Sequence, residues 1–303
     1  MLSVCIPIYN YDVRPLVKAI ADEAASLPTV EVEIVCIDDH SDAEYVVLNQ
    51  SVSENATLIR LDANIGRARI RNLFLEHARG KYLLFLDNDM VVSDGFLQRY
   101  LDTMLTNHAV VVGGIAYDKR YNDDEHRLRY LYAQQAECRP LAERQADPYR
   151  SFMTGNFMIR RDILEHTQFD ERITGYGHED TLFGYRLRQQ AIPITHIDNP
   201  AINGQIEINV DFLNKTVEAV RNMAVIYSFM QSDRVFCRSV RLIHAYRRLQ
   251  HWHLTGIAYG LFRLLKRPLE SHFISGTNIS VSQLNFYKLG IFINSLEHKN
   301  KQE

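Results

Sequence analysis

The stretch Leu83-Leu84-Phe85-Leu86-Asp87-Asn88-Asp89 joins an apolar run to two carboxylates separated by one residue. A short, uninterrupted apolar run of this kind is typical of a strand that is buried on both faces. Asp87 and Asp89 would then follow the carboxyl end of that strand, where open α/β sheets bind their ligands. Two such carboxylates suit a hard divalent cation that holds a diphosphate. Asp and Asn are also common in ordinary turns, so the pair alone leaves both interpretations open.

The first 116 residues alternate between strand-like and helix-like segments. Short apolar segments, often β-branched, predict strands at 2–8, 32–37, 57–61, 82–86 and 109–116. Segments with helical spacing lie between them, at 13–25, 43–52, 67–77 and 95–105. The alternation predicts an α/β fold whose mostly parallel sheet has helices on both faces. The glycine fingerprint of a dinucleotide fold is missing after the first strand, which argues against a nicotinamide enzyme.

Composition and charge restrict the class of protein. The chain has 303 residues, of which 46% are hydrophobic and 23% charged, as in globular proteins with a substantial core. A formal net charge of -3 gives no global argument for nucleic acid as a partner. Four cysteines without a Cys-x-x-Cys spacing predict buried thiols in a reducing compartment. We find no signal peptide and no apolar stretch of about 18 residues, so we expect a cytoplasmic protein, soluble or peripheral on the inner face of the membrane.

Polar and aromatic residues also follow the first two predicted strands. These residues are Pro7, Tyr9 and Asn10 after the first strand, and Asp38, Asp39 and Ser41 after the second. A carboxylate there can accept hydrogen bonds from a base imide or from ribose hydroxyls, and Tyr9 offers a flat surface for a base. The alternative is local, since Pro7 can end a strand and Asp39 with Ser41 can cap a helix.

A turn and two arginines follow the third predicted strand. Asn64 and Gly66 permit a tight turn into a helix, and Arg67 and Arg71, four residues apart, share one face of it. Guanidinium groups near a helix start are natural neighbours of phosphate, and solvated surface arginines are the alternative.

Taken in order, these motifs resemble the inverting glycosyltransferases of family 2, which have the GT-A fold. The resemblance covers about residues 1–205 and implies a sugar nucleotide, with UDP favoured, whose base lies at Tyr9 and Asp39. It places Asp87 at the ribose or the metal, and Asp89 on Mn²⁺ or Mg²⁺. The donor-binding residues that it implies are Pro7, Tyr9, Asn10, Asp38, Asp39, Asn64, Gly66, Arg71, Asp87, Asn88, Gly155 and Asn156.

A fifth motif, Gly175-Tyr176-Gly177-His178-Glu179-Asp180, opens a helix-like segment at 181–190. It resembles the acceptor-side motif of the same enzymes in a galactosyltransferase-like form, in which a carboxylate acts as base. The resemblance implies Asp180, or else Glu179, as the base, and Tyr176, Gly177 and His178 as acceptor or sugar pocket. The alternative is that the two acids only favour the dipole of the helix that they begin.

The third protein ligand of the metal is not evident. Many related enzymes have a histidine after the strand-like segment at 192–195, and this chain has Asn203 in the corresponding stretch. His196 is a candidate ligand, with a structural role as the alternative.

The chain changes character after residue 206. We expect residues 1–206 to form the catalytic domain, with a nucleotide-binding half at 1–116 and an acceptor half at 117–206, in which 117–150 is a helical or mobile insertion. The pattern of residues 207–303 predicts long helices. Between Arg234 and Leu269 there are eight Lys or Arg and no acidic residue. On one continuous helix, Arg234, Arg238, Arg241 and Arg248 would share a side, so 234–267 predicts contact with a membrane surface, or packing against the catalytic domain or a second subunit of a homo-oligomer.

The sequence therefore predicts a metal-dependent inverting glycosyltransferase. It would move a hexosyl or N-acetylhexosaminyl group to a glycan or lipid-linked glycan in the synthesis of a surface polysaccharide or lipopolysaccharide. One alternative is a nucleotidyltransferase, although that class would have a glycine-rich basic loop after the first strand. The other is a catalytically silent protein that binds sugar nucleotides or acts as a scaffold.

Overall fold

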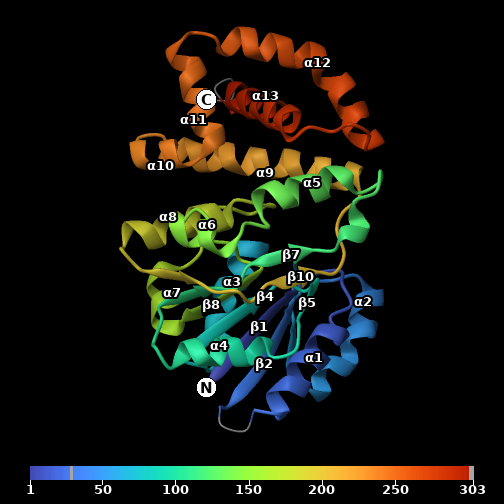
Figure 1. Ribbon diagram of the computed structural model, residues 1–303, viewed down its shortest axis with the longest axis vertical. Coiled ribbons are helices and arrows are strands. Elements are labelled where there is room, and N and C mark those ends of the chain that lie inside the picture. The colour runs from blue at the N-terminus through green and yellow to red at the C-terminus, as the bar shows by residue number, and fades with distance from the viewer. Residues whose placement is uncertain (28–29, 300–303) are drawn as a thin grey trace. The chain divides into compact units, whose positions relative to one another are not determined.

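A seven-stranded mixed sheet forms the centre of the computed structural model, which describes residues 1–27 and 30–299 (Figure 1). Its order is β3-β2-β1-β4-β8-β6-β9. The bounds are β1 Leu2–Ile8, β2 Val32–Asp38, β3 Thr57–Arg60, β4 Tyr82–Leu86, β6 Val110–Val112, β8 Asn156–Arg160 and β9 Ile194–His196. Only β8 among them is antiparallel to its neighbours, β4 and β6. The predicted mostly parallel sheet is confirmed.

Helices cover both faces of this sheet, and those predicted at 13–25, 67–77, 95–105 and 181–190 have bounds within two residues of the predicted ones. They are α1 Arg14–Ala25, α2 Ala43–Leu48, α3 Arg67–His77, α4 Phe96–Met104, α6 Leu141–Ala146, α7 Arg161–Thr167 and α8 Glu179–Gln189, with the 3₁₀ helix η1 at Asn49–Glu54. One core cluster joins β4 and β8 to α3 and α8 through aromatic side chains. In it, Phe85 stacks on Phe157 with ring centroids 5.0 Å apart, and Phe169 stacks on Phe183 at 4.0 Å. All five residues of β4 are buried, as its apolar run predicts.

The predicted strand at 109–116 is two strands, because Gly113 and Gly114 interrupt it. β6 ends at Val112, and β7 (Ile115–Tyr117) belongs to a second, three-stranded sheet with β5 (Met90–Val91) and β10 (Ala201–Asn203). Gly114 has a φ of +95°, and a Cβ on Gly113 would lie 2.4 Å from the Asn199 carbonyl oxygen. This small sheet brings the residues after β4 next to those of β10.

The described residues group into two compact units. The first comprises Met1–Asp118, Ala136–Thr174 and Glu179–Gln205, and the second comprises Lys119–Gln135, Gly175–His178 and the chain from Ile206 onward. The division of the chain into domains at residue 206 stays a prediction.

The second unit is helical. It contains η2 (Lys119–Tyr121), most of α5 (Arg127–Ala136), α9 (Asn209–Met230), α10 (Arg234–Ser239), α11 (Arg241–His251), α12 (Thr255–Ser275) and α13 (Val281–Lys299). Its core includes the edge-to-face ring contacts of Tyr227, Tyr246 and Phe292. No helix among the described residues is long and apolar enough to cross a membrane.

The expectation of one continuous helix through the basic segment 234–267 is wrong. The segment breaks at Val240, whose backbone is extended, and again before α12, where His253 has a φ of +56°. These breaks let α11 turn its buried residues Ile243 and Tyr246 toward the other helices. Arg234 and Arg238 therefore belong to α10 and do not share a helical face with the arginines of α11.

Candidate active site

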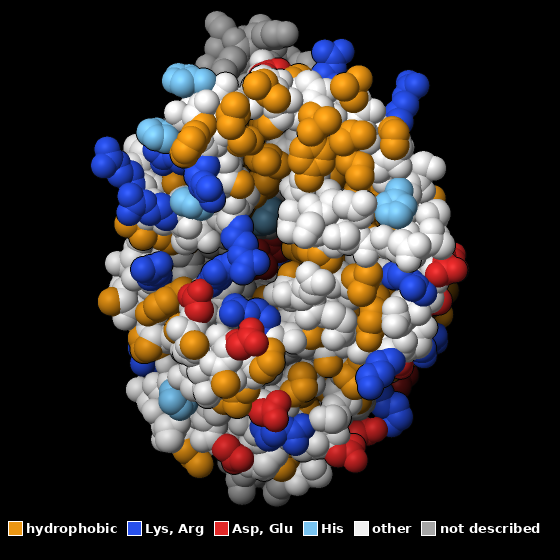
Figure 2. Space-filling model, turned by 45° about the horizontal axis from the view of Figure 1, so that its top comes forward, with side chains coloured by type: hydrophobic (Ala, Val, Ile, Leu, Met, Phe, Trp, Pro, Cys, Tyr) orange, Lys and Arg blue, Asp and Glu red, His pale blue; other side chains and the backbone are white. Residues whose placement is uncertain are grey.

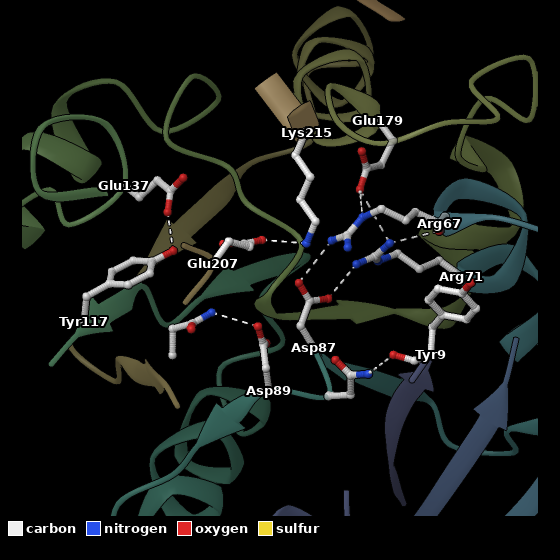
Figure 3. Close-up of polar contacts among 12 residues, drawn as sticks. Tyr9, Arg67, Arg71, Asp87, Asp89, Tyr117, Glu137, Glu179, Glu207 and Lys215 are labelled. Atoms are coloured by element: carbon white, nitrogen blue, oxygen red, sulfur yellow. Dashed lines mark hydrogen bonds and ion pairs between the residues drawn. The ribbon is translucent and has the colours of Figure 1, made fainter. Parts of the chain in front are cut away.

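The carboxyl ends of three adjacent parallel strands carry the predicted donor-site residues. β1 pairs with β2 and with β4 in parallel, so the residues that follow these three strands lie at one edge of the sheet. Pro7 lies within β1, opposite Ile37 of β2. Figure 3 shows Tyr9, Arg67, Arg71, Asp87 and Asp89 around this edge.

Two arginines of α3 and two carboxylates form an ionic cluster, drawn in Figure 3. Asp87 accepts from Arg67 Nη2 at 3.1 Å and from Arg71 Nη2 at 2.6 Å. Glu179 Oε1 accepts from Arg67 Nε at 2.8 Å and lies 3.6 Å from Arg71 Nη1. Arg71 is fully buried, so its charge is balanced by these two acids and by the Arg67 carbonyl oxygen, to which it also donates. Both oxygens of Asp87 accept from guanidinium groups, and its role at the ribose or the metal stays a prediction.

This cluster gives the two acids at the start of α8 different properties. Burial alone would raise the pKa of Glu179, but the charges of Arg67 and Arg71 outweigh burial and hold it below its usual value. Burial and the adjacent charge of Glu179 raise the pKa of Asp180 to about 7. A base is most effective when its pKa lies near the working pH. Asp180 is therefore the acid suited to accept a proton, and Glu179 is held in place by its arginines.

Asp89 and Asn203 form a second polar pair. β5 and β10 are antiparallel, which places Asn203 opposite Met90. Asn203 Nδ2 donates to Asp89 Oδ2 at 2.9 Å, and Gly204 N donates to the Asp89 carbonyl oxygen at 2.7 Å. Oδ1 of Asn203 is buried and has no hydrogen-bond partner among the described residues.

These two side chains fit a divalent cation, because hard cations take carboxylate and amide oxygens as ligands. Asp89 and Oδ1 of Asn203 would be its protein ligands. Within residues 1–27 and 30–299 no group of three or more His, Cys, Asp or Glu side chains is arranged to hold a metal. We expect a diphosphate and water to supply the remaining ligands of the cation.

His196 has a different environment from that of a metal ligand. Its ring is buried, with Nδ1 3.2 Å from Arg144 Nη1 and Nε2 2.9 Å from the Pro148 carbonyl oxygen. Burial lowers the pKa of His196 and favours the neutral ring, which accepts from Arg144 and donates to Pro148. Both nitrogens are engaged within the protein, so the prediction that His196 binds the metal finds no support.

Asp39 organises the turn before α3. Its carboxylate accepts from the backbone N–H groups of Ile65 at 2.7 Å and Gly66 at 3.0 Å, and Asn64 Nδ2 donates to the Asp39 carbonyl oxygen at 3.1 Å. Gly66 has a φ of +84°, and a Cβ there would lie 2.8 Å from the Thr174 carbonyl oxygen. Each carboxylate oxygen of Asp39 keeps a second lone pair, so binding of a nucleoside at Asp39 stays a prediction compatible with this geometry.

The ends of β1 and β2 are tied together beside Tyr9. Asn10 N donates to Ser41 Oγ at 2.9 Å, and Ser41 N donates to Asp38 Oδ1 at 2.7 Å. Asn88 Nδ2 donates to the Tyr9 carbonyl oxygen at 3.3 Å. The side chain of Tyr9 is itself exposed, at 53%. Asp38, Asn10 and Asn88 thus hold the backbone, and the ring of Tyr9 is open to a ligand.

Gly155 and Asn156, both predicted to bind the donor, have separate roles in the structure. Asn156 is buried, and its side chain donates to the Gly114 and Asn199 carbonyl oxygens and accepts from Tyr100, so it stabilises the strands. A Cβ on Gly155 would lie 2.9 Å from Ile115 Cδ1 and 3.3 Å from Asp87 Oδ2, so glycine lets the backbone pack closely beside that carboxylate.

The loop that precedes Glu179 is held by α9 within the second unit. Tyr176 N donates to Glu218 Oε1 at 2.8 Å, and Asn222 Nδ2 donates to the Tyr176 carbonyl oxygen at 3.1 Å. Gly177 and His178 both have positive φ values, of +90° and +71°. Sequence reasoning missed Glu218 and Asn222, because polar residues on a long amphipathic helix read as its solvent-facing side.

The sequence matches the model of glycosyl transferase family 2 over residues 3–167, which is more than half of the chain. A Haemophilus influenzae protein described as an uncharacterized glycosyltransferase is 29% identical over 117 residues, or 38% of this chain and 46% of that protein. A poly(ribitol-phosphate) beta-glucosyltransferase of Bacillus spizizenii is 30% identical over 119 residues, or 37% of this chain and 18% of that protein. The matched region spans less than two thirds of the first curated relatives.

A mannosyltransferase from Pyrobaculum calidifontis, solved with GDP-Man and Mn²⁺, is similar in structure, with a TM-score of 0.60, 14% identity, and coverage of 99% of this chain and 86% of that one. Glucosyl-3-phosphoglycerate synthase from Mycobacterium tuberculosis, solved with Mn²⁺, UDP and glucosyl-3-phosphoglycerate, gives a TM-score of 0.51 at 17% identity, covering 75% of this chain and 79% of that one. The predicted GT-A fold is confirmed. On the strength of the family match, this chain belongs to glycosyl transferase family 2.

Proposed function

We propose that the protein transfers a sugar from a nucleotide-diphosphate sugar to a hydroxyl of a glycan, with inversion at the anomeric carbon and with Mn²⁺ or Mg²⁺ as cofactor. The donor is a UDP-sugar carrying a hexose or N-acetylhexosamine. The acceptor is a free or lipid-linked glycan of a surface polysaccharide or lipopolysaccharide. The family supports this proposal, as do the nucleotides and Mn²⁺ named for the two solved structures and the wall-polymer enzyme among the relatives.

The observation that carries the proposal is the contrast between Glu179 and Asp180. An acceptor hydroxyl is a weak nucleophile until a base takes its proton. Asp180, with a pKa of about 7, is ionised in a useful fraction at neutral pH and binds the proton well once it is transferred. As the hydroxyl oxygen bonds to the anomeric carbon, its proton passes to Asp180 and the bond to the diphosphate oxygen breaks.

The ionic cluster favours a single displacement. Retention through a covalent intermediate needs a carboxylate nucleophile on the sugar. Asp87 is held through both oxygens and Glu179 through Oε1 by Arg67 and Arg71, and this pairing with guanidinium groups makes both carboxylates poor nucleophiles. One in-line substitution with Asp180 as base inverts the configuration.

The donor side is assigned to the sheet edge. Tyr9 stacks on the base, Asp39 accepts from it, and the ribose or sugar lies beside Asp87 and the backbone of Gly155. A divalent cation held by Asp89 and Asn203 would neutralise the charge that develops on the departing diphosphate. Tyr176, Gly177 and His178 are assigned to the acceptor side.

Donor hydrolysis tests the proposal. Wild type and Asp180→Asn are incubated with a panel of nucleotide sugars, with and without Mn²⁺, and the released nucleoside diphosphate is measured. We expect metal-dependent turnover by wild type and a large loss in Asp180→Asn. Thermal shift with nucleoside diphosphates and Mn²⁺ identifies the base, because a ligand that binds the native state stabilises it. No metal-dependent turnover with any sugar nucleotide would overturn the enzymatic assignment.

A further inference from the structure

Helix α12 carries an apolar stripe that faces solvent. Ile257, Leu261 and Leu264 are exposed at 70%, 48% and 77%, and their spacing of four and three residues places them on one face of the helix. The core of the unit is on another face, where Phe262 and Phe273 are buried. The helix therefore has an outer apolar face in addition to the one that it needs for folding.

The ends and edges of the stripe extend this surface. Leu254 and Leu265 are also exposed, and Trp252 lies in the turn between α11 and α12 with 67% of its surface exposed. A Cβ on Gly256 or Gly260 would find no atom within 4 Å, so no described residue covers the helix there. We define the α12 surface as Trp252, Leu254, Ile257, Leu261, Leu264 and Leu265. A contiguous apolar area of this kind marks an interaction site.

Positive charge borders the α12 surface. Arg263 and Arg267 are exposed, and their spacing of four residues sets them together along one side of the stripe. The preceding helix α11 adds exposed positive charge to the same unit, since Arg241 and Arg248 share the side opposite its buried residue Ile243. Figure 2 shows hydrophobic side chains gathered on the upper part of the face in view, with Lys and Arg at the edges.

We propose that the α12 surface binds the surface of an anionic phospholipid bilayer, with the helix lying in the plane of the headgroups. An apolar stripe flanked by arginines, with an aromatic residue at its end, has the amphipathic composition of an interfacial helix. Between Arg234 and Leu269 the sequence has eight basic residues and no acidic one. A second copy of the chain would bring the same positive charge to the contact, whereas anionic lipid would neutralise it. The proposal does not depend on the transfer reaction.

Intrinsic fluorescence reports directly on this surface, because Trp252 is the only tryptophan of the sequence. The full-length protein is titrated with vesicles of phosphatidylcholine alone and with vesicles that also contain phosphatidylglycerol, and binding is measured in parallel by co-sedimentation. We expect a blue shift of the emission and co-sedimentation only with the anionic vesicles, both weakened by added salt.

Matched variants separate the apolar and the charged contributions. Ile257→Asp with Leu264→Asp should abolish co-sedimentation, whereas Leu105→Asp, at a position that is 87% exposed in the first unit, should leave it unchanged. Arg263→Gln with Arg267→Gln should weaken binding about five-fold for each arginine lost. The control is Arg69→Gln with Arg150→Gln, which removes the same charge from arginines elsewhere whose side chains are 63% and 41% exposed. All of these side chains reach solvent, and circular dichroism verifies that each variant is folded.

Two results would overturn the proposal. One is the absence of a blue shift and of co-sedimentation for wild type with anionic vesicles. The other is a wild-type dimer, measured by light scattering, that becomes monomeric in the Ile257→Asp, Leu264→Asp variant, since this would assign the α12 surface to a second copy. Failure of the glycosyltransferase assay would leave the vesicle result standing.

Discussion

Asp180→Asn should cause a large loss of turnover and at the same time stabilise the protein above neutral pH. Asp180 has a folded-state pKa of about 7, raised from 3.8 by burial and by Glu179. Between these two values the unfolded state releases the proton and the folded state keeps it, so a rise in pH favours unfolding. Asparagine does not ionise in this range and keeps an oxygen that can accept from the Thr181 N–H, as Oδ1 of Asp180 does now.

The size of the gain follows from the two pKa values. Linkage gives an increase in the free energy of unfolding of about 0.6 kcal/mol at pH 4, about 1.7 kcal/mol at pH 5 and about 4 kcal/mol at pH 8. These are upper values, because the side chain of Asp180 is only partly buried and water weakens its interaction with Glu179. The increase in this gain of stability from acid to alkaline pH is the result that identifies ionisation of Asp180 as its cause.

Urea unfolding of wild type and Asp180→Asn, followed by circular dichroism at pH 5 and pH 8, measures this difference. Asp94→Asn removes an exposed carboxylate as a control and should change the free energy of unfolding by no more than about 0.5 kcal/mol. The reasoning is refuted if Asp180→Asn destabilises the protein at pH 8, or if its gain is the same at both pH values.

Three further predictions concern the same site. The kcat/KM of wild type should fall about ten-fold per pH unit below pH 7, where Asp180 is protonated. Glu179→Gln should move this fall in kcat/KM to lower pH, because it removes a charge that raises the pKa of Asp180. An unchanged pH profile in Glu179→Gln would contradict the effect of Glu179 on the pKa of Asp180. Arg71→Met should destabilise the protein by roughly 3–5 kcal/mol in urea unfolding, since it leaves the buried Glu179 and the partly buried Asp87 with Arg67 alone. Arg69→Met, on the exposed side of α3, should have little effect, and equal losses would mean that the charge of Arg71 does not stabilise the fold. Asn203→Ala should raise the Mn²⁺ concentration for half-maximal activity roughly ten-fold or more, and an unchanged metal requirement would exclude Asn203 as a ligand.

Local patterns predicted the sheet and its edge well. The alternation of strands and helices up to residue 105 depends on side chains close together in sequence, and the bounds of β1, β4 and α3 agree with it. Where the prediction failed, the cause was backbone geometry that local hydrophobicity does not encode, as at Gly113 and Gly114 between β6 and β7 and at the extended residue Val240.

Long-range pairing limited the prediction of the site. The spacing of Arg67 and Arg71 correctly indicated one helical face, but the partner Glu179 is 112 residues away from Arg67 in sequence. Nothing local indicated that Asp87 would be shared by both arginines. Asn203 stands where many enzymes of the family that the sequence resembles have a histidine. Only the pairing of β5 with β10 shows that Asn203 contacts Asp89.

The anomeric configuration of the first product tests the central claim most directly. An α-linked nucleotide sugar is incubated with the protein and Mn²⁺, and ¹H NMR follows the sugar that is released before mutarotation or the linkage formed on an acceptor. A single displacement with Asp180 as base predicts the β product from wild type and no product from Asp180→Asn. An α product, or undiminished turnover by Asp180→Asn, would contradict it.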